Sequence, residues 1–137
     1  MHPAIIAALD EHEKTRFIIE SLAPLADDAQ VVASQFPGLL PDIRASAVNG
    51  AIWLQIFITD MDQLATVRRA MVERGFHLHD RTEHLDCGYF VLDHRRPGSD
   101  LRILLQVSIL SREGARCRLV KVGEKTVSEY AIKCGEG

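Results

Sequence analysis

Apolar positions recur at helical spacing in two stretches near the start of the chain. The first stretch alternates spacings of four and three residues along the line Ile5, Leu9, His12, Arg16 and Ile19. It predicts a helix that ends near Leu22, because Pro24 removes a backbone donor. A second helix is predicted from the line Leu25, Ala29, Val32 and Phe36. Two prolines and a glycine between residues 36 and 42 end it.

The middle of the chain predicts a β-hairpin followed by a helix. Asn49-Gly50 separates two strand-like runs, 43–48 and 51–59, and suits a two-residue type I′ turn. The second run is apolar on both faces apart from Gln55, which is typical of a central strand with one face under helices. A helix is then expected from about Met61 to Glu73, with its N-cap at residue 59 or 60 and Gly75 after its end.

The rest of the chain reads as a β-meander of five strands. Their expected ranges are 76–80, 88–93, 101–110, 117–122 and 126–134. In the third of these, residues 101, 103, 105, 107 and 109 form one apolar face. The predicted class is therefore α+β, a mainly antiparallel sheet with helices on one face. We expect a single domain over 1–137, with a helical segment at 1–36 and a sheet-containing core at 43–134.

Length and composition agree with one globular domain. The chain has 137 residues, of which 47% are apolar and 26% charged. Its longest unbroken apolar stretch, residues 4–9, is far shorter than the roughly 20 residues of a membrane span. Three cysteines, an odd number without C-x-x-C spacing, indicate free thiols in a reducing compartment. We therefore expect a cytoplasmic protein without membrane contact.

Charge is distributed unevenly along the chain. The net charge is −3, and residues 1–42 hold two basic and seven acidic groups. The sequence-derived pI is near 6.0, so direct binding of nucleic acid is not expected. An acidic segment instead suits a protein partner with a basic surface. The acidic candidates for that contact are Asp10, Glu13, Glu20, Asp27 and Asp28; the alternative is an ordinary solvated face.

Two adjacent arginines, Arg95 and Arg96, lie in a turn-like segment between Asp93 and Asp100. Paired guanidinium groups suit carboxylate or phosphate recognition, because each planar fork can bind two oxygens. One interpretation is a contact surface for an acidic partner. Another is a nucleotide phosphate site shared with the helix N-terminus at Asp60, and the third is a solvated hairpin turn.

Four of the residues able to bind zinc lie close together in the sequence. They follow the pattern H-x-H-x4-H-x2-C and are His77, His79, His84 and Cys87. Their types are acceptable for zinc, provided that a turn after residue 80 brings all four to one ion. The alternative is two solvent-facing histidines on a strand. Zinc is the one cofactor that the sequence suggests; otherwise none is expected.

Catalytic signatures are missing from the sequence. It contains no G-x-S-x-G elbow, no phosphate-binding G-x-x-x-x-G-K-[ST] loop and no H-E-x-x-H helix. Asp60 and Asp62 are the residue types of an N-cap and of a first-turn acid, which need no chemistry. We therefore expect no catalytic residue.

The C-terminal segment has two features that bear on function. Residues 117–127 and 129–134 resemble the closing segment of small uncharacterised proteins encoded by bacteriophages and prophages, and the resemblance extends over about residues 76–134. It implies inhibition of a host defence, CRISPR effectors included, by binding. From the residues alone, a turn at Gly123-Glu124 places Cys117 opposite Tyr130. Cys134 then lies about 13 Å further along, too far for a disulfide.

Together these features favour a non-enzymatic binding protein that inhibits a nucleic-acid-handling machine. The alternatives are a small-ligand or nucleotide binder and a zinc-binding protein or enzyme. A homodimer is a further alternative, formed through the mixed face of the third meander strand, which carries Arg102, Leu104, Gln106 and Leu110.

Overall fold

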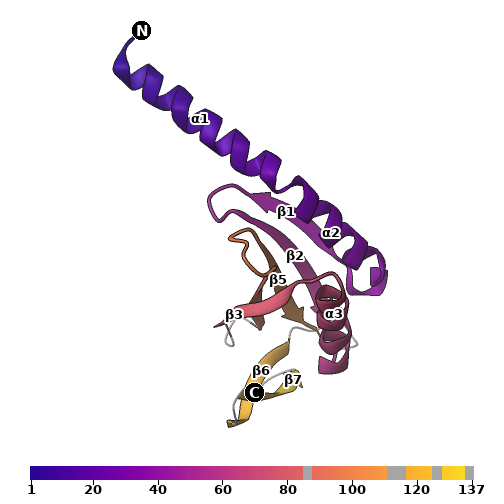
Figure 1. Ribbon diagram of the computed structural model, residues 1–137. Coiled ribbons are helices and arrows are strands. Elements are labelled where there is room, and N and C mark those ends of the chain that lie inside the picture. Colours follow the sequence, from indigo (N-terminus) through magenta and orange to yellow (C-terminus); the bar gives the residue numbers. More distant parts are fainter. Residues whose placement is uncertain (85–87, 111–116, 125–127, 135–137) are drawn as a thin grey trace.

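The computed structural model describes residues 1–84, 88–110, 117–124 and 128–134, with only the backbone for residues 84, 117–124 and 128–134. The described residues form three α-helices and seven strands, and Figure 1 shows how they are arranged. The helices are α1 (Pro3–Ser21), α2 (Ala23–Ser34) and α3 (Met61–Glu73), with a short 3-10 turn at Pro37–Leu39. The strands are β1 (Asp42–Ser46), β2 (Ala51–Ile58), β3 (His77–His84), β4 (Tyr89–Arg95), β5 (Arg102–Ile109), β6 (Cys117–Glu124) and β7 (Ser128–Cys134).

Five strands form a mixed sheet in the order β1-β2-β5-β4-β3, and β6 pairs with β7 in a separate two-stranded sheet. The α+β prediction is confirmed. The expected five-stranded meander is wrong. Of its five strands, β3, β4 and β5 follow one another antiparallel in the main sheet, whereas β6 and β7 form a separate sheet. β5 also pairs in parallel with β2, with Leu54 opposite Leu105. Two apolar strands thus occupy the centre, and residues 59–101 supply the crossover that a parallel pair requires.

The core lies between one face of this sheet and helices α2 and α3. β2 contributes alternate buried residues to that face: Ile52, Leu54, Ile56 and Ile58. The helices contribute the apolar lines expected from their periodicity: Leu25, Ala29 and Val32 from α2, and Leu64, Val67 and Met71 from α3. The central position of β2 and its coverage by helices on one face are confirmed.

The predicted N-cap and end of α3 are confirmed, whereas the predicted two-residue turn of the β1–β2 hairpin is wrong. Asp60 and Gln63 form a reciprocal capping box at the start of α3, and Gly75 follows its end at a φ of +88°. In the hairpin, Ser46 pairs with Ala51, so the loop contains four residues instead of two. A type I′ turn needs positive φ at both central residues. Gly50 has it, but Asn49 does not, and its side chain and backbone instead donate to Ser46 Oγ.

Helix α1 departs from its expected packing. The break between α1 and α2 falls at Leu22, as Pro24 predicts. Yet α1 continues away from the sheet, as Figure 1 shows, and none of its residues is buried. Its apolar stripe therefore faces solvent, whereas helical periodicity normally indicates contact with a core.

The register of the β6–β7 hairpin also differs from the expectation. β6 continues through Gly123 and Glu124, with a register shift between Lys121 and Gly123. Tyr130 therefore pairs with Lys121, and Cys117 lies directly opposite Cys134. The prediction that these cysteines are about 13 Å apart is wrong, because it placed the turn within what is the end of β6.

Within the described residues, no helix combines the length and the apolar character that a membrane crossing requires.

Two phenylalanines provide a matched test of the position of α1. Phe17 is 71% exposed on α1, whereas Phe76 is 1% exposed in the core. We expect Phe76→Ala to lower the free energy of unfolding by about 3–5 kcal/mol. Phe17→Ala should change it by no more than about 0.5 kcal/mol. Urea unfolding at low protein concentration measures both, and comparable losses would show that α1 packs on the domain.

Candidate functional site

Three of the five acidic candidates are exposed and unpaired. Asp10 and Glu13 on α1 and Asp27 on α2 are exposed, and within the described part of the chain none of them has an ion-pair partner. Glu20 accepts from Arg16 Nε at 2.9 Å, a surface pair within α1. Among the five candidates, Asp10 and Glu13 on α1 and Asp27 on α2 are therefore the ones available to a partner.

The same helix carries five of the eleven large apolar side chains that are exposed in the described part of the chain. They are 47–71% exposed and comprise Ile5, Ile6, Leu9, Phe17 and Ile19. The periodicity of this stripe is typical of a helix face that packs on a core, so the sequence does not single it out as a candidate surface. One signal was available: His12 and Arg16 interrupt the apolar line, which is unusual for a face turned to a core. Exposed apolar clusters of this kind mark interaction surfaces.

Asp28 and Arg96, predicted from separate segments as partner contacts, bind each other. Asp28 Oδ2 accepts from Arg96 Nη2 at 2.9 Å, and Oδ1 accepts from Arg74 Nη2 at 2.6 Å. The Asp28 side chain is only 11% exposed, and Arg96 also stacks 4.2 Å from the centre of the Phe76 ring. This cluster joins α2 to the end of α3 and to the segment after β4. The charges of Asp28 and Arg96 therefore stabilise the fold.

Replacing Asp28 should therefore destabilise the protein far more than replacing its neighbour. Asp28→Asn leaves two guanidinium groups without their carboxylate, and we expect a loss of about 2–4 kcal/mol in the free energy of unfolding. The matched control Asp27→Asn removes an exposed, unpaired charge and should change it by less than about 0.5 kcal/mol. Chemical denaturation measures the difference; equal effects would contradict the internal role of Asp28.

Arg95 is bound on the opposite face of the sheet. Its Nη2 donates to Asp93 Oδ2 at 3.1 Å, and Arg102 Nη1 donates to the same oxygen at 3.2 Å. Burial works to raise the pKa of Asp93, but the hydrogen bonds and charges of the two arginines outweigh it and leave that pKa lowered. The hydrogen bond to Asp93 in turn raises the pKa of Arg95. The three side chains form an internal network on the sheet face opposite to α2 and α3.

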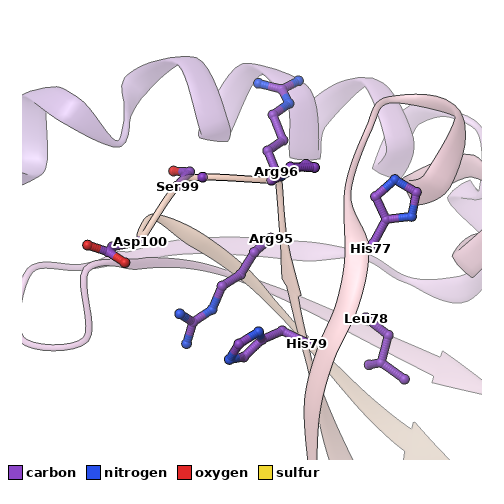
Figure 2. Close-up of a pocket in the computed structure, with 9 residues that line it drawn as sticks. His77, Leu78, His79, Arg95, Arg96, Ser99 and Asp100 are labelled. Carbon is purple, nitrogen blue, oxygen red and sulfur yellow. The ribbon is translucent and has the colours of Figure 1, made fainter.

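The two adjacent arginines consequently do not form a joint phosphate clamp. They border an open hollow of about 510 Å³, which His77, His79, Ser99 and Asp100 also line. Figure 2 shows the Arg96 side chain directed toward a helix, while Arg95 extends to the other side, near His79. The N-terminus of α3 is not free for an anion either, because the Asp60 carboxylate accepts from Gln63 N at 3.0 Å.

The four zinc-ligand candidates are not brought together. β3 is extended from His77 to His84, so the turn expected after residue 80 is wrong. At the rise of a strand, the α-carbons of His79 and His84 are roughly 16 Å apart, whereas zinc ligands lie about 2.0–2.3 Å from one ion. Cys87 lies outside the described residues. Within the described ranges, no group of three or more His, Cys, Asp or Glu residues could hold a metal.

His94, which in the sequence falls in the turn-like segment after Asp93, is part of the core. His94 lies on β4 and is 1% exposed. Its Nδ1 is 3.1 Å from the carbonyl oxygen of Leu92. That oxygen only accepts, so Nδ1 carries the proton and the neutral ring donates the bond. Burial lowers the pKa of His94 from 6.5 to about 4.

His94 should make stability sensitive to acid. Because its folded pKa of about 4 is below its unfolded value of 6.5, the neutral ring stabilises the protein above pH 6.5. That contribution is lost as pH falls from 6.5 to about 4. We expect the free energy of unfolding to decrease by about 3 kcal/mol between pH 7 and pH 4. In His94→Gln this part of the pH dependence should disappear, while the exposed-site control His79→Gln should keep it. Urea unfolding at several pH values measures this, and identical profiles for the native protein and His94→Gln would refute it.

A scan against protein-family models and a search of curated proteins gave no match to this chain.

Proposed function

We propose that this protein acts by binding another protein through α1. The docking helix is defined by its exposed apolar residues, Ile5, Ile6, Leu9, Phe17 and Ile19, together with the acidic Asp10 and Glu13. The observation that carries the proposal is that this 19-residue helix has no buried residue. In proteins, most of the stability of a helix comes from packing of its apolar face against other elements. A partner that covers its apolar side chains would stabilise the helix and bury a continuous surface at once.

The partner that fits this helix is a protein with an apolar groove bordered by basic residues. Asp10 and Glu13 are unpaired within the described part of the chain and lie among the apolar side chains. Opposite potentials accelerate association and fix the orientation of the partners. An amphipathic helix that enters an apolar groove is also a recurrent recognition mode.

The more specific proposal is inhibition of a nucleic-acid-handling machine of a host defence, of the CRISPR type among others. Such machines present basic surfaces, which the acidic groups of α1 complement. The resemblance of residues 76–134 to small phage-encoded proteins supports the same partner class by analogy. The pairing of Arg95 and Arg96 with carboxylates of this chain makes a phosphate-binding function less well supported.

Variants of the docking helix test this proposal. The tagged protein is incubated with lysate of its native cells at low and high salt, and captured proteins are identified and then retested in purified form. The apolar variant carries Leu9→Ser and Phe17→Ser, and the charge variant carries Asp10→Lys and Glu13→Lys. We expect the apolar variant to bind at least about tenfold more weakly. The charge variant should lose the gain in association that low salt gives the native protein.

Control variants change exposed residues elsewhere. Val48→Ser in the β1–β2 loop and Glu73→Lys at the end of α3 should leave binding unchanged, since both positions are exposed and distant in the sequence from α1. Circular dichroism checks that all variants remain folded. The proposal fails if a purified partner binds the native and both α1 variants equally. It also fails if light scattering shows a dimer that Phe17→Ser dissociates, or if α1 binds lipid vesicles instead of the captured protein.

A further inference from the structure

The backbone of the C-terminal hairpin places two of the three cysteines at one register position. Cys117 begins β6 and Cys134 ends β7, and the two residues are direct partners in the antiparallel ladder. Directly paired residues of antiparallel strands have α-carbons about 4.5–5.5 Å apart. Disulfides accept separations of about 4.4–6.8 Å. The register therefore meets the distance requirement for a disulfide, and the two positions share a face of the hairpin.

The neighbouring positions suggest why a covalent link would matter here. The next pair in the ladder is Arg118 opposite Lys133, and like charges at opposed positions weaken a strand pair. A two-stranded sheet is at best marginally stable in water by itself. β6 and β7 pair with each other and not with the five-stranded sheet.

We propose that Cys117 and Cys134 form an intramolecular disulfide that closes the open end of the β6–β7 hairpin. The oxidant is a low-molecular-mass disulfide of the glutathione type. One cysteine thiolate attacks a sulfur of this disulfide, forms a mixed disulfide and releases one glutathione thiolate. The second cysteine thiolate attacks the protein sulfur of the mixed disulfide and releases the second glutathione. The two cysteines lose two electrons and two protons, and one glutathione disulfide becomes two thiols.

The link makes the hairpin responsive to redox conditions. Closing the loop between residues 117 and 134 restricts the unfolded ensemble of this segment, so the paired strands are favoured while the disulfide is intact. Thiol excess in a reducing compartment reverses the exchange. This modification site is independent of the docking helix, so failure of either proposal leaves the other standing.

The experiment equilibrates the full chain with defined ratios of reduced and oxidised glutathione, then blocks the remaining thiols and maps them by mass spectrometry. We expect one blocked thiol, at Cys87, and a peptide that links Cys117 to Cys134. The equilibrium constant for this pairing should be at least about tenfold higher in the native protein than in concentrated urea, because the ladder holds the partners together. Hydrogen exchange of residues 117–124 and 128–134 should be slower in the oxidised protein.

Single substitutions separate this pairing from chance oxidation. Cys87→Ser should still form the link, whereas Cys117→Ser should take up glutathione at Cys134 without an internal bond. The proposal is overturned if both hairpin cysteines remain open to blocking in the native protein. It is equally overturned if either one pairs with Cys87 or another molecule, or if urea leaves the equilibrium constant unchanged.

Discussion

The parallel pairing of β2 with β5 is the contact on which the rest of the fold depends. Both strands carry apolar residues on the face beneath the helices, with Leu54 opposite Leu105, and each has a hydrogen-bonded neighbour on both edges. Strands that run in parallel cannot be joined by a tight turn. The intervening chain must cross over, and it does so as α3 followed by β3 and β4. This route places α3 over the core and brings β4 beside β5.

The position of β4 then decides what its charged residues do. Successive residues of a strand point to opposite faces, so Asp93 and Arg95 lie on the face opposite to α2 and α3 while His94 enters the core. Arg96 follows the strand and reaches Asp28 on α2. Asp93, Arg95 and Arg96 thus bind charged groups of this chain, and the Arg96–Asp28 and Arg102–Asp93 ion pairs each join two elements. Arg95 and Arg96, which suggest anion recognition in the sequence, therefore bind carboxylates of this chain and stabilise its fold.

The two ends of the chain contrast with this internally satisfied centre. α1 has no buried residue, and the β6–β7 hairpin forms its own sheet. In proteins, most of the stability of a helix comes from packing of its apolar face, and a single hairpin is at best marginally stable in water. A protein partner on α1 and a covalent link in the hairpin are the two proposals that would supply the missing stabilisation. Function is therefore sought at the ends of the chain, while the central sheet serves as their support.

The sequence by itself determined the features that depend on neighbouring residues. The α1–α2 break before Pro24, the Asp60–Gln63 cap of α3 and the apolar character of β2 follow from spacing and local hydrogen bonding. It also predicted the α+β class. The tertiary structure decided the exposure of α1, the pairing of β5 with β2, and the Asp28 contacts with residues 46 and 68 positions away. Local patterns define the faces of an element, but which face is covered depends on the partners that the whole chain brings to it.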